Sequence, residues 1–181
     1  MKIENSYLNE VKIITPDIYF DERGNFSEVY KSSVFKNNGI RAKFVQDNEV
    51  KSKYGVLRGL HYQLKSPQGK LIRCILGTII DVAVDIRIGS PTFGKHIKLE
   101  LSADNKKMLY VPEGFAHGYL VTSKKSIVIY KCTTYYDEND QYGVIWNDKD
   151  LDINWNFETP ALSKKDKTLP MLKINKHLPK Y

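Results

Sequence analysis

The segment from Thr78 to Ile88 places the strongest constraint on what this chain can fold into. Apolar side chains occupy every second position, at Ile80, Val82, Val84, Ile86 and Ile88. The positions between them hold Asp81, Ala83, Asp85 and Arg87. Successive side chains of a β-strand point to opposite faces, so this alternation predicts a strand. Gly77 precedes it, and the turn-forming residues Gly89-Ser90-Pro91 follow it.

Shorter segments of the same character run along most of the chain. We expect strands over Val11–Phe20, Asn25–Tyr30, Lys43–Val50, Gly55–Leu64, Lys70–Leu76, His96–Leu101, Met108–Val111, Gly118–Val121 and Ser126–Thr133. A short helix is expected over Lys31–Asn38, where Gly39 is well placed to end it. About ten short strands separated by Gly and Pro turns are typical of an all-β barrel or jelly roll. The segment 146–170 reads as irregular structure.

Length and composition favour one globular unit. With 181 residues, and with no repeat or low-complexity linker, the chain is expected to form a single domain over 1–181. No apolar run is long enough to span a bilayer, and the first residues lack the apolar core of a signal peptide. We therefore expect a cytoplasmic protein without a membrane partner. Cys74 and Cys132 lie far apart without ligand spacing, and we interpret them as buried small side chains.

The net charge of +7 raises the question of nucleic-acid binding, and the distribution of that charge argues against it. Residues 163–181 contain six lysines and one acid, Asp166, which gives +5 and leaves about +2 for residues 1–162. No RNA-binding motif with interleaved aromatic residues accompanies the basic tail. A small anionic ligand such as a nucleotide diphosphate fits this charge equally well, and no nucleic-acid partner is expected.

Two histidine-containing stretches draw attention. The first is Gly55-Val56-Leu57-Arg58-Gly59-Leu60-His61-Tyr62-Gln63, which places an arginine and an imidazole within one predicted strand. The second is Pro112-Glu113-Gly114-Phe115-Ala116-His117-Gly118, a turn from which His117 emerges. This second stretch resembles the second motif of the cupin superfamily of small β-barrels. The first cupin motif would supply further ligands for a metal, but here a single histidine, His61, takes its place. Two histidines make a poor transition-metal site, so a cupin-like barrel without a metal is expected.

The polar face of the 78–88 strand leaves two interpretations open. Asp81 and Asp85 either face water or, if the barrel is open at its centre, line a cavity with His61. A polar barrel with histidine, lysine, tyrosine and aspartate suits proton abstraction next to a carbonyl. Histidine is matched to proton transfer near neutral pH, lysine stabilises an oxyanion, and tyrosine can protonate a strongly basic carbanion. Removal of a proton from one face and its return to the other is epimerisation.

Ordered motifs along nearly the whole chain resemble those of the bacterial dTDP-4-dehydrorhamnose 3,5-epimerases of nucleotide-sugar biosynthesis. The matching residues are Asp21-x-Arg23-Gly24-x-Phe26, Gly55–His61, Lys70, Asp81–Arg87, Gly89–Gly94, Pro112–Gly118, Tyr130–Thr133, Tyr136 and Leu162-Ser163-x-x-Asp166. The resemblance implies an all-β, cupin-like jelly-roll barrel with short peripheral helices and an irregular C-terminal segment. It also implies an isomerase that needs no cofactor and that inverts C3 and C5 of a dTDP-linked 4-keto sugar.

The resemblance further implies residue roles. His61 would be the base, Asp166 its partner, Lys70 the group that stabilises the enolate, and Tyr130 the acid on the opposite face. His117 would line the same pocket, with Asp81 orienting it. Substrate contacts would come from Arg23, Phe26, Glu28, Gln46, Asn48, Arg58, His117, Tyr136 and Lys165, with Arg23 and Arg58 on the diphosphate. Lys165 stands where an arginine is often found. The resemblance also implies a homodimer in which N-terminal strand residues enter the partner's sheet or active site.

Three other functions remain open from the sequence. The chain could invert a single carbon, or act on another 4-keto nucleotide sugar such as a GDP-linked heptose. It could also be a metal-dependent cupin oxygenase or isomerase, which the missing second histidine of the first motif argues against. A non-catalytic module that binds nucleotide sugars would leave the set His61, Asp166, Lys70 and Tyr130 unexplained.

Overall fold

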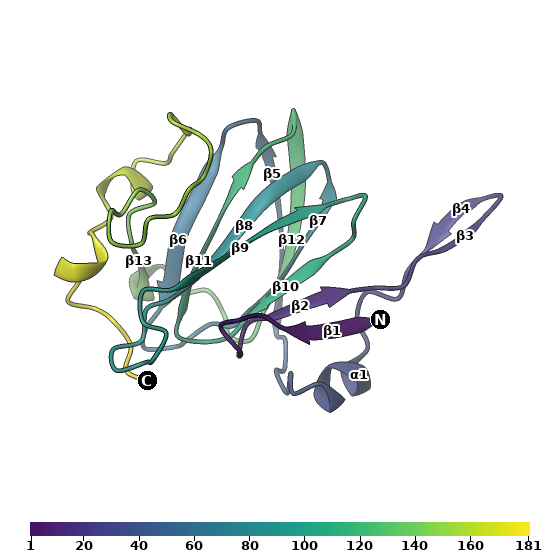
Figure 1. Ribbon diagram of the computed structural model, residues 1–181, viewed down its shortest axis with the longest axis horizontal. Helices are drawn as coiled ribbons and strands as arrows, with labels where there is room; N and C mark the ends of the chain where they lie inside the picture. The colour runs from purple at the N-terminus through teal and green to yellow at the C-terminus, as the bar shows by residue number, and fades with distance from the viewer.

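The computed structural model describes all residues 1–181 and consists mainly of antiparallel strands (Figure 1). The strands are β1 (Lys2–Asn5), β2 (Lys12–Thr15), β3 (Tyr19–Asp21), β4 (Gly24–Phe26), β5 (Gln46–Lys53), β6 (Leu57–Gln63), β7 (Lys70–Leu76), β8 (Thr78–Asp85), β9 (His96–Ser102), β10 (Met108–Val111), β11 (Phe115–Val121), β12 (Lys125–Cys132) and β13 (Gln141–Gly143). One helix, α1 (Ser32–Asn37), and three short 3-10 turns, η1 (Glu138–Asp140), η2 (Asp166–Thr168) and η3 (Leu172–Ile174), complete the chain. The expected all-β fold is confirmed.

Strands β5 to β12 form a jelly roll, in which neighbours in sequence mostly lie in opposite sheets. One sheet has the order β1-β2-β10-β7-β12-β5, and the facing sheet has the order β13-β6-β11-β8-β9. Within these, β5-β12-β7-β10 and β6-β11-β8-β9 are the two four-stranded layers expected of two linked Greek keys. β1 and β2 widen one layer, and β13 widens the other.

The space between the sheets is apolar at one end. Leu8 and Val11 from the N-terminal turn pack there with inward side chains of the facing strands, such as Ile72, Ile79 and Val128. Burying these apolar side chains is the main favourable contribution to folding. This apolar cluster fills only one end of the space between the sheets. The other end carries polar side chains.

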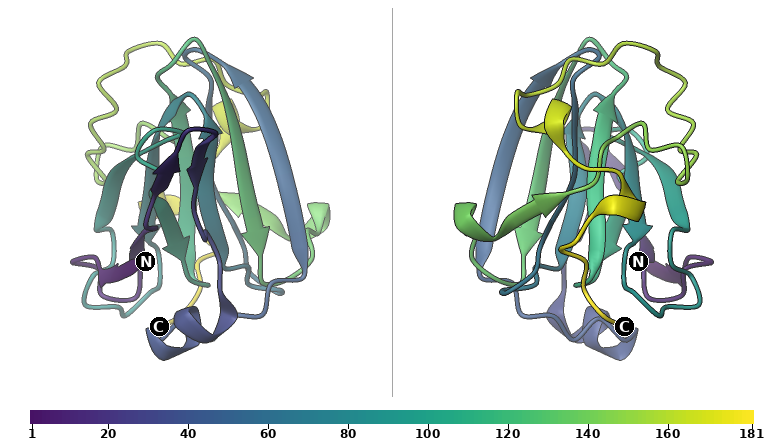
Figure 2. Two further views of the ribbon diagram at one scale, coloured as in Figure 1. Left: turned by 90° about the vertical axis from the view of Figure 1, so that its right-hand side faces the viewer. Right: turned by 90° about the vertical axis from the view of Figure 1, so that its left-hand side faces the viewer.

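A second core lies on the outer face of the five-stranded sheet. Val82, Val84 and Ile86 of the predicted alternating strand point outward, yet they are fully buried. The segment after β13 runs across this face as an extended chain with two short turns (Figure 2), and it contributes Leu151, Trp155 and Leu172 to the core. The irregular C-terminal structure is therefore a packed layer, which explains why both faces of β8 avoid water.

Polar contacts fasten this layer to the sheet. The Asp148 carboxylate accepts a hydrogen bond from the backbone N–H of Leu172 at 2.6 Å. The Tyr62 hydroxyl donates to the carbonyl of His177 at 2.7 Å, and the Asn175 amide donates to the Tyr62 oxygen at 3.0 Å. The first contact joins two parts of the layer, and the two Tyr62 contacts hold its last residues against β6.

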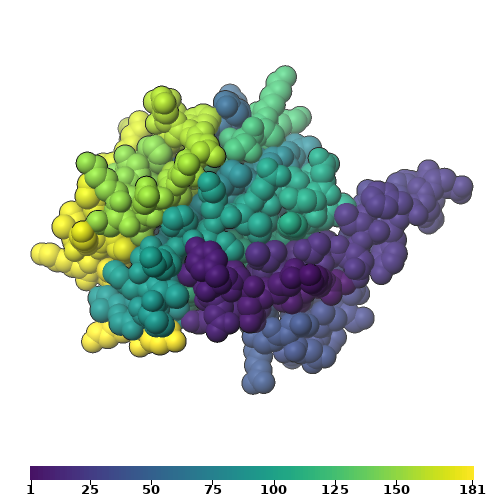
Figure 3. Space-filling view, viewed as in Figure 1, coloured from purple at the N-terminus to yellow at the C-terminus, as the bar shows by residue number.

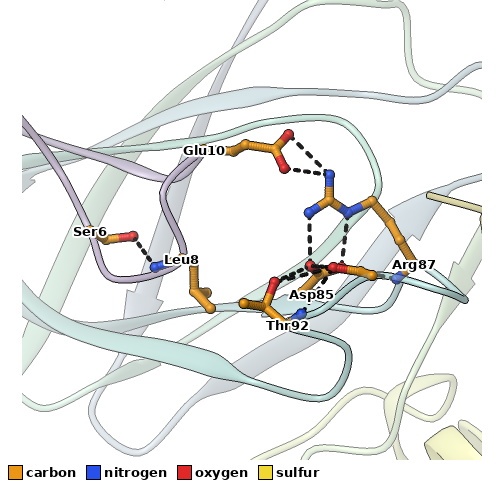
Figure 4. A network of polar contacts seen from close by, with 7 residues as sticks. Ser6, Leu8, Glu10, Asp85, Arg87 and Thr92 are labelled. Atoms are coloured by element: carbon orange, nitrogen blue, oxygen red, sulfur yellow. Dashed lines mark hydrogen bonds and ion pairs between the residues drawn. The ribbon is translucent and has the colours of Figure 1, made fainter.

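The strand predicted over 78–88 ends earlier, at Asp85, because the chain turns to bury an ion-pair network (Figure 4). Asp85 is completely buried, and its carboxylate accepts hydrogen bonds from Arg87 Nε at 2.9 Å and Arg87 Nη2 at 2.7 Å. The hydroxyls of Ser90 and Thr92 each donate to it at 2.6 Å. Burial alone would raise the pKa of Asp85, but these donors together lower it to about 2.

Other boundaries also shift. The strand expected over 25–30 stops at Phe26, the strand expected over 43–50 lies at Gln46–Lys53, and β1 and β13 were not predicted. The expected helix is confirmed: α1 ends just before Gly39, which has φ +83, a conformation that glycine adopts without strain. No helix is long and apolar enough to cross a membrane.

The hairpin of β3 and β4 extends away from the rest of the molecule as an arm (Figures 1 and 3). Its aromatic side chains are exposed, with Tyr19 at 61%, Phe20 at 76% and Phe26 at 67%. Arg23 at its tip is paired only with Asp21 of the same hairpin. Such an arm buries little of its own apolar surface within one chain.

Candidate active site

A cavity of about 380 Å³ opens between the two sheets at the polar end of the barrel. It is lined by Gln46, Asn48, Val50, Arg58, His61, Tyr62, Gln63, Gln68, Lys70, His117, Tyr119, Tyr130, Tyr136, Gln141, Ser163, Lys165 and Asp166. The four residues expected to be catalytic all line it, together with most of the expected substrate contacts. Side chains from separate segments of the sequence therefore meet in one place.

The first wall of the cavity carries a histidine–aspartate pair. His61 lies on β6, and its Nε2 is 2.6 Å from Asp166 Oδ1. The Asp166 side chain is 4% exposed, and η2 of the C-terminal layer places it there. Burial would raise the pKa of Asp166, but the hydrogen bond and charge of His61, with donors such as Ser163, lower it. The ionised carboxylate accepts the Nε2 proton, which leaves Nδ1 of neutral His61 as the basic nitrogen.

A second such pair lies beside the first. His117 on β11 is the direct cross-strand neighbour of His61, and its Nε2 is 2.8 Å from Asp81 Oδ1. Asp81 is fully buried, and its second carboxylate oxygen has no hydrogen-bond partner. Of the two interpretations of the polar face of β8, the interior one therefore holds for Asp81, since its side chain points between the sheets. The Asp85 carboxylate is instead bound by Arg87, Ser90 and Thr92.

Two glycines allow the strands that carry these histidines to approach closely. A Cβ atom added to Gly59 would lie 2.5 Å from the Cα of Gly118 and 2.8 Å from the His117 carbonyl oxygen. The register between β6 and β11 shifts at this point, between His117 and Tyr119. A larger residue at either position would force the strands apart. This close approach explains why a glycine, Gly59, stands between Arg58 and His61.

The opposite wall carries a lysine and a tyrosine. Lys70 on β7 pairs in register with Cys132 on β12, and Tyr130 is two residues before Cys132, so the two side chains are diagonal neighbours on the inner face. Burial lowers the pKa of Lys70, against the opposing effects of Cys132 and Asp81. Burial likewise raises the pKa of Tyr130, so its phenol stays protonated at neutral pH.

The rim of the cavity holds further polar groups that the sequence predicted. Arg58 donates from Nε to the Ser52 hydroxyl at 3.2 Å. The Gln46 amide nitrogen donates to Asn48 at 3.0 Å, and the Gln46 oxygen accepts from the backbone N–H of Tyr136 at 2.9 Å. Asn48 lies directly opposite Tyr130 in the β5–β12 ladder. Lys165, next to Asp166, lies at the exposed mouth.

Three expected substrate contacts lie away from the cavity. Arg23 and Phe26 belong to the projecting β3–β4 arm, and Glu28 follows the arm and pairs with Lys31 at 3.8 Å. None of the three lines the cavity formed by this chain. Within one chain they therefore lie apart from the other expected substrate contacts.

Sequence reasoning missed several lining residues, for different reasons. Gln63 and Tyr119 each follow a cavity histidine by two positions, so the strand alternation alone would have placed them on the same face. Ser163 could have been found from its position three residues before Asp166. Its hydroxyl accepts a hydrogen bond from the backbone N–H of Asp166 at 3.0 Å. Gln141 and Gln68 carried no signal, because β13 is only three residues long and Gln68 lies in the turn before β7.

The two cysteines lie in the interior of the barrel. Cys74 and Cys132 are both buried and free, as expected of small interior side chains. Burial raises the pKa of both thiols. No group of three or more His, Cys, Asp or Glu side chains is arranged to hold a metal ion.

Comparisons with known proteins agree with this geometry. The family model described as dTDP-4-dehydrorhamnose 3,5-epimerase matches residues 5–174. The enzyme of that name from Shigella flexneri is 47% identical over 168 residues, which are 92% of this chain and 93% of that protein. A crystal structure of dTDP-6-deoxy-D-glucose-3,5-epimerase from Legionella pneumophila, in complex with dTDP-4-keto-L-rhamnose, is 44% identical. It superposes with a TM-score of 0.96 and covers 99% of this chain and 98% of that one.

A more distant structure shows the breadth of the fold. The 3'-monoepimerase from Streptomyces bikiniensis, in complex with dTDP-quinovose, is 30% identical with a TM-score of 0.92, covering 98% of this chain and 92% of that one. Because the family model spans most of the chain and a relative at 47% identity matches over nearly its full length, membership does not depend on the fold alone. This chain belongs to the dTDP-4-dehydrorhamnose 3,5-epimerase family.

Proposed function

We propose that this chain is a nucleotide-sugar 3,5-epimerase that converts dTDP-4-dehydro-6-deoxy-D-glucose into dTDP-4-dehydro-L-rhamnose. One observation carries the proposal: the basic histidine His61 and the protonated phenol of Tyr130 lie on opposite walls of one cavity. A sugar ring held between the two sheets would meet a base on one face and an acid on the other. Inversion of a carbon needs both.

The proton transfers would proceed as follows. Nδ1 of His61 removes the proton from the carbon next to the 4-keto group, and the C–H electron pair moves into an enolate with its negative charge on O4. The Lys70 ammonium stabilises that charge. Tyr130 then donates its phenolic proton to the opposite face of the same carbon, which restores the ketone with inverted configuration. Solvent takes the proton from His61 and returns one to Tyr130, so no atom is gained or lost.

The ionisation states on each wall fit these roles. The lowered pKa of Asp166 keeps its carboxylate charged, so it stabilises His61 when the imidazole accepts a proton. The raised pKa of Tyr130 keeps its proton available until a strongly basic enolate forms. Burial lowers the pKa of Lys70, and the charges of Cys132 and Asp81 oppose this effect. No carboxylate lies within ion-pair distance of Lys70, so its ammonium is free to face O4.

The charged rim supports a diphosphate ligand. Arg58 and Lys165 both line the cavity, and their cationic side chains suit phosphate oxygens. Gln46, Asn48 and Tyr136 would contact the sugar or the nucleoside. His117, held by Asp81, would donate or accept a hydrogen bond at the sugar beside His61.

The remaining contacts lead us to propose a homodimer. Arg23, Phe26 and Glu28 would reach the cavity of a second copy, where Arg23 would bind the diphosphate. The projecting arm with its exposed aromatic side chains supports this, since association would bury that surface.

The first test is incubation with dTDP-4-keto-6-deoxyglucose in deuterated water, with deuterium at C3 and C5 read by NMR and mass spectrometry. Deuterium at both carbons is expected. Deuterium at one carbon would instead indicate a single-centre epimerase, the alternative favoured by the likeness to the Streptomyces monoepimerase. No exchange by a folded protein that binds dTDP would refute the epimerase proposal for this sugar.

The dimer proposal has its own test. Arg23→Ala and His61→Ala variants are each expected to be inactive. A mixture of the two, after unfolding and refolding together, would form hybrid dimers in which one cavity has both His61 and an intact arm from the other copy. Recovered activity in the mixture is expected, and a mixture as inactive as its parts would show that the arm does not act in a second copy.

A further inference from the structure

A single hydrogen bond restrains the side chain of Arg58 within the cavity. Arg58 lies exposed on β6, and its Nε donates to the hydroxyl of Ser52 on β5 at 3.2 Å. Because β5 and β6 belong to opposite sheets, the arginine side chain spans the space between them. Its two Nη groups form no hydrogen bond or ion pair within the chain, so they remain available to an anionic ligand.

Three buried hydroxyl groups gather behind Arg58. Ser52 is buried, Tyr119 on β11 is the direct cross-strand neighbour of Arg58, and Ser126 on β12 is that of Ser52. The hydroxyls of Tyr119 and Ser126 are both buried without a hydrogen-bond partner of ordinary geometry. A buried hydroxyl that is left unpaired destabilises the fold, so its presence beside a cavity calls for a functional reason.

The Tyr119 phenol interacts with both Arg58 and Ser52. Burial raises the pKa of Tyr119 to about 12, while the charge of Arg58 and the hydroxyl of Ser52 act in the opposite direction. Since an arginine side chain only donates, the Ser52 oxygen accepts from Arg58, and the proton of Ser52 is free to point elsewhere. A slight movement towards the unpaired Tyr119 oxygen would complete a chain of hydrogen bonds from Arg58 through Ser52 to Tyr119.

We propose that Ser52 and Tyr119 are positioning residues, which hold the Arg58 guanidinium in the orientation that binds the diphosphate of the ligand. The inference rests on the proposed function, because that function assigns Arg58 to a diphosphate. Both hydroxyls are buried, so they act through Arg58 and not on the substrate itself. An arginine that is ordered before binding loses less rotamer freedom when the ligand arrives, so the pair should increase affinity and leave kcat unchanged.

The test compares two variants that each remove one oxygen atom. Tyr119→Phe keeps the ring and loses only the hydroxyl, and Ser52→Ala removes the acceptor of Arg58. Calorimetric titration with dTDP is expected to show about 2- to 10-fold weaker binding in each variant, the size of one lost hydrogen bond. Affinity for thymidine, which has no phosphate, should be unchanged by NMR titration, as should kcat for deuterium exchange into dTDP-4-keto-6-deoxyglucose. Tyr110→Phe is the matched control, because this buried tyrosine on β10 lies outside the cavity and should not affect dTDP binding.

Two further measurements separate positioning from a loss of packing. Because the Tyr119 hydroxyl is buried and unpaired, Tyr119→Phe should have a urea midpoint equal to or above that of wild type while its affinity for dTDP falls. Tyr119→Phe combined with Arg58→Met should bind dTDP no more weakly than Arg58→Met alone, because the group to be positioned is missing. Combined with Lys165→Met, which removes a different cation of the cavity, Tyr119→Phe should show its full effect.

Wild-type affinity for dTDP in either single variant, or an equal loss of affinity for thymidine, would overturn the inference. A lowered urea midpoint in Tyr119→Phe, a lowered kcat, or a full effect of this variant in the Arg58→Met background would also overturn it. Failure of the wild-type chain to exchange deuterium would refute the proposed function instead, and the dTDP titrations would still report on Arg58. A chain that does not bind dTDP at all would overturn both.

Discussion

Replacing Arg87 with methionine removes the guanidinium that faces the buried Asp85 carboxylate (Figure 4). Methionine keeps most of the apolar stem. The guanidinium that it removes also lies over two aromatic rings, with Cζ 4.5 Å from the ring centre of Phe115 and 4.7 Å from that of Tyr181. The substitution therefore tests the charge more than the volume. Asp85 would keep the hydroxyls of Ser90 and Thr92 as donors, but it would lose both side-chain donors of Arg87.

The expected destabilisation follows from the burial of the two partners. Asp85 is fully buried and Arg87 is 7% exposed, and removing one partner of a buried ion pair typically costs about 3–5 kcal/mol. The contact of Arg87 with Glu10 adds less than about 1 kcal/mol, because the Glu10 side chain is half-exposed. For a chain of this length, the total corresponds to a decrease in melting temperature of roughly 6–20 °C.

Urea unfolding at pH 7, followed by the fluorescence of Trp146 and Trp155, measures this free energy at a fixed protein concentration. Lys173→Met is the matched control, because it breaks a surface ion pair with Asp150 and should cost less than about 1 kcal/mol. The double variant Asp85→Asn with Arg87→Met should be more stable than Arg87→Met alone, since it removes the unpaired buried charge.

The pH dependence gives a second check. A pKa of Asp85 near 2 in the folded protein, below its usual 3.8, contributes about 2 kcal/mol at neutral pH. This stabilisation is complete above about pH 4 and is lost as the pH falls towards 2. In Arg87→Met the carboxyl can protonate more readily, so the difference from wild type should shrink as the pH is lowered. A difference under 1 kcal/mol at pH 7, or one independent of pH, would refute this account of the network.

Three further predictions concern the site. His61→Ala should lower deuterium exchange at least about 100-fold, because it removes the base, while the urea midpoint stays close to wild type; full exchange would contradict the mechanism. Tyr130→Phe should retain exchange from the His61 face but lose net inversion, read as deuterium returned with unchanged configuration by NMR. Asp166→Asn should lower kcat and leave the affinity for dTDP unchanged, since the amide cannot stabilise a charged His61; a selective loss of dTDP affinity would assign Asp166 to binding.

Local chemistry in the sequence was sufficient for much of the fold. The alternation in Thr78–Ile88 identified a strand because side-chain direction follows directly from backbone geometry. Gly39 correctly marked the end of α1, and the turn before His117 was visible from its proline and glycines. The family motifs brought His61, Lys70, Tyr130 and Asp166 together as a hypothesis before any coordinates, and the structure places all four on one cavity.

Tertiary structure decided which faces avoid water. Alternation shows that Asp81 and Asp85 share a side of the strand, but not that this side points into a barrel while the apolar side lies beneath a C-terminal layer. Asp166 reaches His61 across 105 residues, through a segment without periodicity. Gln141 reaches Tyr136 and Lys165 in the same way. Such contacts depend on how whole layers pack, because long-range proximity leaves no trace in local spacing. That packing also leaves the β3–β4 arm, with Arg23 and Phe26, outside the cavity of its own chain.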